Sequence, residues 1–312
     1  MNPFTAILQE AYGVHPVHVQ SKQGGWASLA FEIKAEDAAY FLKVYEKRRA
    51  STPKLTAWID QYAPIVEWLA YSSDLKGKIP VPLQTKEGKY QCEDTENSYL
   101  LYPFIDGETI GEQGLTKQQV SEFAHIIAAL HSFGKEIPFP TKALKEDFDV
   151  PFLEELEEVI HFNEKHIPGE LHALFRENRE KIAAWISSIK ELSEKLKSAS
   201  FDMVLCHTDL HHWNLMQGEK LLLIDWEGLK LAPPEADMMF LTEKPYWKQF
   251  MEVYLQHHES YHINQDALAF YQLRRRLEDI WEFAEQLLYE EPDAQEKEEI
   301  IGYLRELTDD TN

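Results

Sequence analysis

A short stretch of this sequence carries side chains whose types and order could do chemistry. It runs from His207 through Asp209 to Asn214, and Asp225 follows it. A carboxylate can accept or orient the proton of a hydroxyl nucleophile, and an amide oxygen and a second carboxylate are ligands that Mg²⁺ prefers. Phosphoryl transfer from ATP needs mainly an aligned nucleophile and neutralised phosphate charge. The order of these residues therefore predicts ATP-dependent phosphoryl transfer.

Each residue of this stretch has an expected role in that chemistry. Asp209 is the base or orienter of the acceptor hydroxyl, and Asn214 and Asp225 are the metal ligands. We expect His207 to hold the catalytic loop by hydrogen bonds. His211 either lies near the substrate or packs within the loop.

Two other interpretations of the same stretch are open. Asp209 and Asn214 could simply cap backbone amides in a turn, which is common for an isolated pair of this kind. A hydrolytic zinc site is also chemically reasonable, and its ligands would be His207, Asp209, His211 and His212. The zinc site leaves Asn214 and Asp225 without a role, and no second histidine cluster follows at a suggestive spacing.

The elements that must position these residues can be predicted from hydrophobic periodicity. Apolar runs at 203–206 and 221–224 flank the stretch and predict a small hairpin that carries it on its loops. Further upstream, residues 28–33 and 40–45 alternate as strands, and residues 55–69 have helical spacing interrupted by Pro64. Helical periodicity dominates after Thr116. The expected fold class is α+β, with a sheet lobe at 1–102, a connector at 103–107 and a mostly helical lobe at 108–312.

The composition excludes several classes of protein. With 31 Lys and Arg against 54 Asp and Glu, the net charge of −23 opposes binding to nucleic acid or anionic membranes and favours cationic partners. The two cysteines lack the spacing of a disulfide scaffold or zinc knuckle. No signal peptide or membrane-spanning segment is recognisable, so we expect a soluble cytoplasmic protein, either monomer or homodimer.

These residues resemble the aminoglycoside phosphotransferase and choline kinase-like family, a branch of the protein-kinase-like fold. The family has an HxDxxxxN catalytic loop, matched from His207 to Asn214, and a metal aspartate in an IDW[ED] segment, matched at 224–227. The segments 205–211 and 271–280 look most like the spectinomycin phosphotransferase-type members. The resemblance covers nearly the whole chain and implies the bilobal kinase-like fold.

The resemblance implies a nucleotide site for ATP, with GTP possible, together with Mg²⁺. Lys43 matches the strand lysine that pairs with the α- and β-phosphates. The loop over the nucleotide matches Gly24, Gly25 and Ser28, and the hinge that meets adenine matches Pro103 and Ile105. The family's helical glutamate, which pairs with the strand lysine, has no match in register. Asp60 is the nearest acid, and Glu67 lies on the turn after Pro64.

The acceptor implied by the resemblance is a small hydroxyl compound, an aminoglycoside or aminocyclitol such as spectinomycin. Carboxylates and aromatic faces would hold its amines. Besides His211, the candidate contacts are Trp226, Glu227, Glu278 and Asp279. Glu235 and Asp237 follow two prolines and are expected to be helix caps. Choline, homoserine or methylthioribose are the other acceptors considered, and a catalytically silent nucleotide-binding protein is the alternative outside the kinases.

Overall fold

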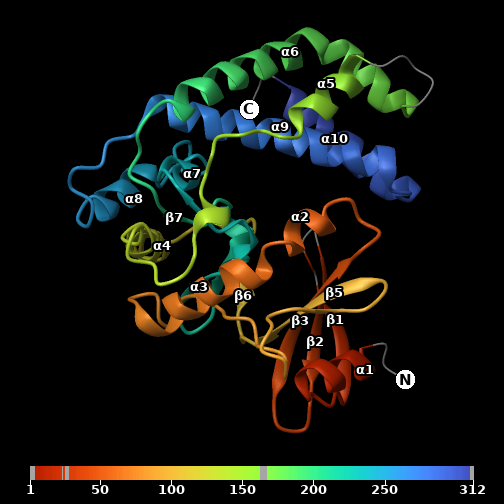
Figure 1. The fold of residues 1–312 in the computed structure, drawn as a ribbon, viewed down its shortest axis with the longest axis vertical. Coiled ribbons are helices and arrows are strands. Elements are labelled where there is room, and N and C mark those ends of the chain that lie inside the picture. The colour runs from red at the N-terminus through yellow and green to blue at the C-terminus, as the bar shows by residue number, and fades with distance from the viewer. Residues whose placement is uncertain (1–3, 23, 25–27, 162–166, 310–312) are drawn as a thin grey trace. The chain divides into compact units, whose positions relative to one another are not determined.

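The computed structural model describes residues 4–22, 24, 28–161 and 167–309 (Figure 1). The chain forms two compact units. The first consists of Met1–Lys145 and Asp202–His262, and the second of Glu146–Phe201 and Ile263–Asn312. The predicted connector at 103–107 lies within the first unit, so these units cross the predicted lobe boundary. Residues from both predicted lobes fall in the first unit because they share one hydrophobic core, in which Tyr45 and Tyr62 pack together with Leu205 and Leu223.

The first unit begins with an antiparallel sheet. The strands run in the order β1-β2-β3-β5-β4. Their bounds are β1 (His18–Lys22), β2 (Leu29–Lys34), β3 (Ala39–Glu46), β4 (Cys92–Glu93) and β5 (Asn97–Pro103). Strand alternation sends Leu42 and Val44 of β3 into one core, while Lys43 and Tyr45 point to the other face. The Lys43 side chain therefore lies on the sheet face opposite the core that contains Leu42.

Four short helical elements belong to this part of the chain. They are α1 (Thr5–Ile7), its π-helical continuation η1 (Leu8–Tyr12), α2 (Thr52–Thr56) and α3 (Ile59–Ser72). Gly13 ends η1 in the left-handed region, with φ of 73°. Pro64 lies inside α3 without ending it, and the expected interruption falls between Thr56 and Ile59 instead. The proline sits in the second turn of α3, where its missing N–H costs the helix a single bond, the one that would go to the Asp60 carbonyl.

The remaining strands of the first unit are short and carry the candidate residues between them. They are β6 (Glu108–Thr109), β7 (Val204–Cys206), β8 (Leu215–Gln217), β9 (Leu221–Leu223) and β10 (Lys230–Ala232). The expected hairpin between 203–206 and 221–224 is wrong. Strand β7 pairs with β10, and β9 pairs with β8 in a sheet of order β6-β8-β9. Strands of three residues are too short for alternation to reveal their pairing.

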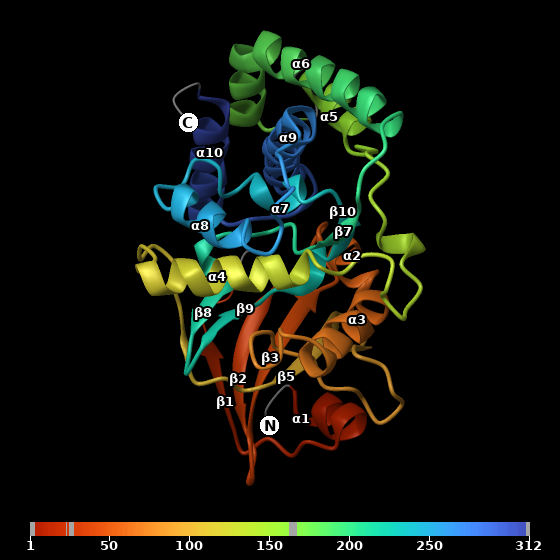
Figure 2. The ribbon, with the colours of Figure 1, turned by 90° about the vertical axis from the view of Figure 1, so that its left-hand side faces the viewer.

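Helix α4 (Lys117–Leu130) begins at a capping box formed by Thr116 and Gln119. Figure 2 shows α4 beside the β8–β9 hairpin. Its buried face packs against α8 (Trp247–Tyr254), for example through Phe123 and Phe250, whose ring centroids are 5.4 Å apart. The unit is completed by α7 (Glu235–Met238) and the 3-10 turns η2 (Lys142–Leu144), η3 (His212–Asn214) and η4 (Trp226–Gly228).

Among the described residues, the regular elements of the second unit are helices joined by loops. It contains α5 (Leu153–His161), α6 (Gly169–Lys197), α9 (Gln265–Tyr289) and α10 (Ala294–Thr308). Helix α6 packs against α5, α9 and α10, and α9 also packs against α10. The predicted class is confirmed: an antiparallel sheet lobe precedes a mostly helical C-terminal part. No helix among the described residues is both long enough and apolar enough to cross a membrane.

Candidate active site

A buried ion cluster links the sheet to the segment after β9. Lys43 projects from the middle of β3, and its Nζ lies 2.9 Å from Oδ1 of Asp225 and 2.6 Å from Oε1 of Glu227. The Tyr45 hydroxyl donates a hydrogen bond to the same Glu227 oxygen. Because strand residues two apart share a face, β3 delivers Lys43 and Tyr45 together.

The charges of this cluster stabilise one another. Burial disfavours the Lys43 ammonium, but the carboxylates of Asp225 and Glu227 outweigh it and raise the pKa of Lys43 well above 10.5. Burial likewise opposes ionisation of Glu227, yet Lys43 and the Tyr45 hydroxyl bring its pKa below its ordinary value of 4.5. Lys43 and Glu227 are therefore both charged at neutral pH.

The acids of α3 do not pair with Lys43. Asp60 accepts the backbone N–H of Tyr90 at 3.1 Å, and Glu67 accepts the Tyr90 hydroxyl at 2.5 Å. The partners of Lys43 come instead from the segment that carries the candidate metal aspartate. The expected choice between Asp60 and Glu67 is thus corrected, since both are committed to the loop around Tyr90.

The catalytic loop brings Asp209 and Asn214 into contact. The Asn214 amide nitrogen donates to Asp209 Oδ2 at 2.8 Å and to the Asp209 carbonyl at 2.9 Å. His211 Nε2 lies 3.2 Å from the same Asp209 carboxylate oxygen and 3.3 Å from the Asn214 nitrogen. The amide nitrogen of Asn214 is thereby engaged with Asp209, which leaves its oxygen as the atom available to a metal.

Two non-glycine residues of the site have left-handed backbones. Thr208, just before Asp209, has φ of 69°, and Asp225 has φ of 65°. Such conformations cost about 1–3 kcal/mol each and need support from their surroundings. Thr208 has that support, because its N–H donates to Asp237 Oδ1 at 2.6 Å and its hydroxyl donates to the Gly228 carbonyl at 2.8 Å.

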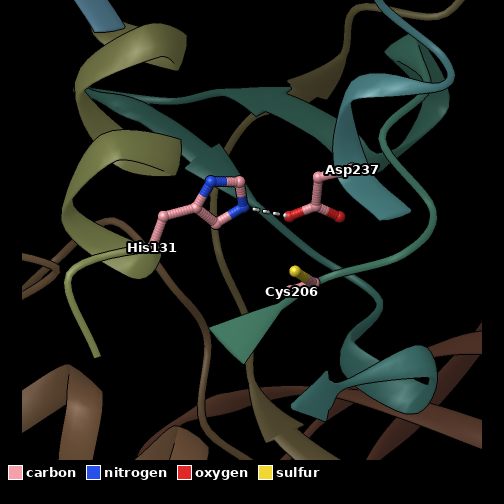
Figure 3. A group of neighbouring side chains, drawn as sticks. All are labelled: His131, Cys206 and Asp237. Atoms are coloured by element: carbon pink, nitrogen blue, oxygen red, sulfur yellow. Dashed lines mark hydrogen bonds and ion pairs between the residues drawn. The ribbon is translucent and has the colours of Figure 1, made fainter. Parts of the chain in front are cut away.

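A fully buried network stands behind the catalytic loop. Asp237 accepts the His207 N–H at 3.0 Å, and its Oδ2 lies 2.9 Å from His131 Nε2 (Figure 3). His131 Nδ1 bonds the Tyr254 hydroxyl at 2.8 Å. Asp237 therefore holds two consecutive loop amides from inside α7. Its expected role as a helix cap is wrong.

The cluster in Figure 3 is the only group of three potential metal ligands found within the described ranges. His131, Cys206 and Asp237 place their ligand atoms within 4.8 Å of one another. Both imidazole nitrogens and both Asp237 oxygens already have protein partners. The Cys206 thiol faces backbone carbonyls, including Pro233 at 3.5 Å. This geometry suits a hydrogen-bonded support for the loop and not a metal centre.

The zinc site considered from the sequence does not fit the geometry either. His207 Nε2 donates to the Ile224 carbonyl at 2.8 Å, while His207 Nδ1 lies 3.3 Å from the Asp209 N–H. His212 Nε2 is bonded to the Tyr246 hydroxyl at 3.0 Å. These imidazoles are engaged with different partners and do not converge on one point. His207 instead connects the catalytic loop to the end of β9.

Two aromatic and acidic candidates for substrate contact are buried within this support. Trp226 is 3% exposed, its indole N–H donates to the Leu223 carbonyl at 2.9 Å, and its ring meets His207 edge-on. Glu227 is occupied by Lys43 and Tyr45. Their burial favours structural and electrostatic roles over contact with an acceptor.

The other candidates from the sequence lie in three places. An added Cβ at Gly24 would be 2.6 Å from the Ser28 carbonyl oxygen, so the backbone there needs glycine, whereas Gly25 lies outside the described residues. Pro103 ends β5, and among backbone groups of the described chain the Ile105 N–H and C=O have no backbone partner. In the second unit, burial lowers the pKa of Arg274, but the charges of Glu146 and Glu278 outweigh burial and raise it. Asp279 binds Arg275 Nε at 2.8 Å.

The donor set at Asn214 and Asp225 fits a magnesium ion. Both offer hard oxygens, and the Asp225 side chain is 39% exposed although one oxygen is held by Lys43. Mg²⁺ retains several waters and is commonly bound by one or two protein oxygens plus phosphates, so this small set is sufficient. The Ile224 N–H donates to the Asn214 carbonyl at 2.9 Å, which ties the two ligand segments together.

Three supporting residues could not be identified from motifs alone. Tyr45 shares a strand face with Lys43, and this alternation is the signal that could have found it. Asp237 and His131 belong to separate helices and meet only through tertiary packing. No local pattern marks them.

Comparison with known proteins places the chain in a family. A family model described as the phosphotransferase enzyme family matches residues 18–271. Protein StrN of Streptomyces griseus is 22% identical over 225 residues, which are 69% of this chain and 67% of StrN.

Two solved structures show the shared fold. One is spectinomycin phosphotransferase APH(9)-Ia with ADP and spectinomycin: the TM-score is 0.73 at 24% identity, covering 99% of this chain and 94% of that one. The other is choline kinase LicA from Streptococcus pneumoniae, with a TM-score of 0.57 at 16% identity, covering 98% and 95% of the two chains.

Proposed function

Because the chain belongs to the phosphotransferase enzyme family and is a kinase of that type, we propose that it transfers the γ-phosphoryl group of ATP to a hydroxyl of a small cationic molecule, an aminoglycoside or aminocyclitol of the spectinomycin kind. The observation that carries the proposal is that Lys43 contacts Asp225, Asn214 contacts Asp209, and the N–H of Ile224, next to Asp225, donates to the Asn214 carbonyl and so joins the two pairs. If Asp209 and Asn214 only capped a turn, their loop would need no connection to Lys43 of β3 through Asp225 and Ile224.

In this proposal the first lobe binds the nucleotide. Lys43 neutralises charge on the α- and β-phosphates, and the backbone around Gly24 and Ser28 approaches phosphate oxygens. Pro103 and Ile105 offer backbone groups to the adenine edge. The N–H and C=O of Ile105 support this role, because they have no backbone partner in the part of the chain that the structure describes. GTP could use the same phosphate contacts.

The chemical step centres on Asp209. The acceptor oxygen attacks the γ-phosphorus, the bond from that phosphorus to the bridging oxygen breaks, and ADP leaves with the bond's electron pair. Asp209 orients the hydroxyl and receives its proton. Asn214 and His211 keep the Asp209 carboxylate in place through its Oδ2 atom. Mg²⁺, held by Asn214 and Asp225, would neutralise phosphate charge when bound.

The acceptor class rests on charge and on the named relatives. A net charge of −23 favours cations over neutral molecules. The relatives with solved structures include a spectinomycin phosphotransferase and a choline kinase. Glu278 and Asp279 remain proposed acceptor contacts from the helical part, as does His211 from the loop. Choline, homoserine and methylthioribose are the acceptors to be compared with aminoglycosides.

The test is ADP release with Mg·ATP across spectinomycin, several aminoglycosides, choline, homoserine and methylthioribose. We expect strong release with one cationic acceptor. Asp209→Asn should lower kcat by about 10²- to 10⁴-fold, since it removes the proton acceptor, and should leave Mg·ATP binding measured by calorimetry unchanged. Full turnover by Asp209→Asn would overturn the role of Asp209, and Mg·ATP binding without turnover of any acceptor would favour a silent nucleotide-binding protein.

A further inference from the structure

The helix that usually supplies an acid to the strand lysine presents a neutral residue here. Tyr62 of α3 is 1% exposed, and its hydroxyl is buried without a hydrogen-bond partner among the described residues. Tyr62 shares a buried core with Tyr45, and α3 packs against η4, which carries Glu227. Burial raises the pKa of Tyr62, and Glu227, Tyr102 and Tyr45 raise it further. Helix α3 therefore meets the ion cluster with a phenol and not with a carboxylate.

The two carboxylates that hold Lys43 are not equivalent. The Glu227 side chain is 10% exposed, and its Oε1 atom accepts from both Lys43 and Tyr45. The Asp225 side chain is 39% exposed, and among the described residues Lys43 is its one hydrogen-bonded side-chain partner. Rotation of Asp225 away from Lys43 breaks one contact, whereas removal of Glu227 breaks two in a buried site.

Resting on the proposed function, we propose that Glu227, oriented by Tyr45, is the positioning residue for Lys43 and takes the place of the missing helix acid. Lys43 keeps Glu227 when nucleotide binds and exchanges Asp225 for phosphate oxygens. Asp225 is thereby released to the metal. Binding of the phosphates at Lys43 is thus coupled, through this ion cluster, to the release of Asp225 for metal binding.

The coupling follows from charge balance. Before nucleotide binds, Lys43 offsets two carboxylates, so Asp225 is held by a cation that also belongs to the phosphate site. The incoming phosphates compete with Asp225 for that ammonium, and the divalent cation that accompanies them attracts the displaced carboxylate. Without Glu227, Lys43 would depend on Asp225 alone and would retain it against the metal.

The test compares Mg·ATP affinity, by calorimetry, of the wild type with Glu227→Gln, Tyr45→Phe and two matched controls. Glu227→Gln should weaken affinity by about 10- to 100-fold, because it removes the charged partner of Lys43, and Tyr45→Phe by about 3- to 10-fold, because it removes one hydrogen bond that orients Glu227 and leaves the charge in place. Asp60→Asn and Glu67→Gln remove the α3 acids in the same way and should bind as the wild type does.

A second measurement separates positioning from a merely structural role. The Mg²⁺ concentration for half-maximal activity should rise in Glu227→Gln. The kcat at saturating Mg·ATP should change less than about 3-fold, which is close to the scatter expected between independent substitutions. Lower kcat with unchanged Mg·ATP affinity and Mg²⁺ requirement would overturn the inference, and so would loss of affinity in Glu67→Gln. Failure of the wild type itself to bind Mg·ATP would instead overturn the proposed function.

Discussion

Gly228 is one of the residues at which the segment 207–214 and the segment after β9 touch. A Cβ added there would lie 2.9 Å from the His207 carbonyl oxygen and closer still to the Thr208 hydroxyl. The Gly228 carbonyl also accepts the Thr208 hydroxyl hydrogen bond that helps to hold the left-handed residue before Asp209. The spacing between the two segments therefore depends on the absence of a side chain.

We predict that Gly228→Ala lowers the free energy of unfolding by about 1–3 kcal/mol, since the surrounding backbone must move to admit a methyl group. Phosphoryl transfer should fall by more than 10-fold, because displacement of Asp209 by about 1 Å is enough to misalign the hydroxyl. Urea unfolding and the ADP-release assay check both effects. Gly114→Ala is the matched control, because nothing lies within 4 Å of its added Cβ, and equal behaviour of the two variants would contradict the prediction.

At this scale the sequence predicted the motif residues but not the residues that support them. The order of Asp209, Asn214 and Asp225 predicted that they lie near one another. Asn214 bonds Asp209, and its carbonyl accepts the N–H of Ile224, next to Asp225, although the strands on either side pair differently from the expected hairpin. Asp237 was misassigned because two prolines and an acid resemble a helix start. Its actual partners are loop amides about 30 positions earlier, a separation at which local patterns carry no information.

At the scale of elements, α4, α7 and α8 join in one line of support for the catalytic loop. His258, just after α8, donates to the Ala128 carbonyl of α4 at 2.9 Å and stacks on Tyr254, with ring centroids 4.7 Å apart. Tyr254 bonds His131, which bonds Asp237. The loop is thus tied to three helices through a single series of contacts.

This line of support predicts a pH dependence of stability. Burial lowers the pKa of His258 below 6.5, and the nearby His131 and His257 lower it further, against the opposing bond to Ala128. Protonation therefore favours the unfolded chain, where the imidazole is solvated. Stability should be fully present above pH 6.5 and should be lost as pH falls through the lower, folded pKa.

The measurement is the urea midpoint at a series of pH values for the wild type and His258→Gln, whose amide can still donate to Ala128. The variant should lose less stability than the wild type between neutral and mildly acidic pH. His262→Gln removes an exposed imidazole and should keep the wild-type slope. A slope in His258→Gln as steep as that of the wild type would assign the acid sensitivity to other groups.

Elements were predictable in proportion to their length. The helices of the C-terminal part have several turns, so their apolar stripes repeat often enough to be read. Strands β7 to β10 have three residues each, and their partners depend on how the chain turns around the buried site. The pairing of β7 with β10 therefore became visible only in the folded chain.

At the scale of the whole molecule, the dominant property is the net charge of −23. Such a surface attracts cations over distances comparable to the Debye length and repels free nucleotides. In the proposed function, nucleotide carried with Mg²⁺ would reach the buried Lys43, whose charge is offset by its own carboxylates, more readily than free nucleotide, because Mg²⁺ offsets part of the phosphate charge.

We predict that kcat/KM for a cationic acceptor falls several-fold as salt rises from about 20 to about 200 mM, since screening removes the long-range attraction. A neutral hydroxyl acceptor should show little change over the same range. Steady-state kinetics with the two acceptors at saturating Mg·ATP checks this. A similar salt response for both acceptors would remove surface charge as a determinant of acceptor choice.

Strands β7 to β10 span one continuous stretch, Val204 to Ala232, that contains Asp209, Asn214 and Asp225, the residues proposed for proton transfer and for the metal. Because the residues proposed for proton transfer and for the metal lie together in this short stretch, most changes within it would impair phosphorylation of any acceptor. A lineage adapting to a new acceptor would therefore accumulate its substitutions elsewhere in the chain. Divergence outside this stretch, set against constancy within it, is the record that a change of substrate would leave among descendants.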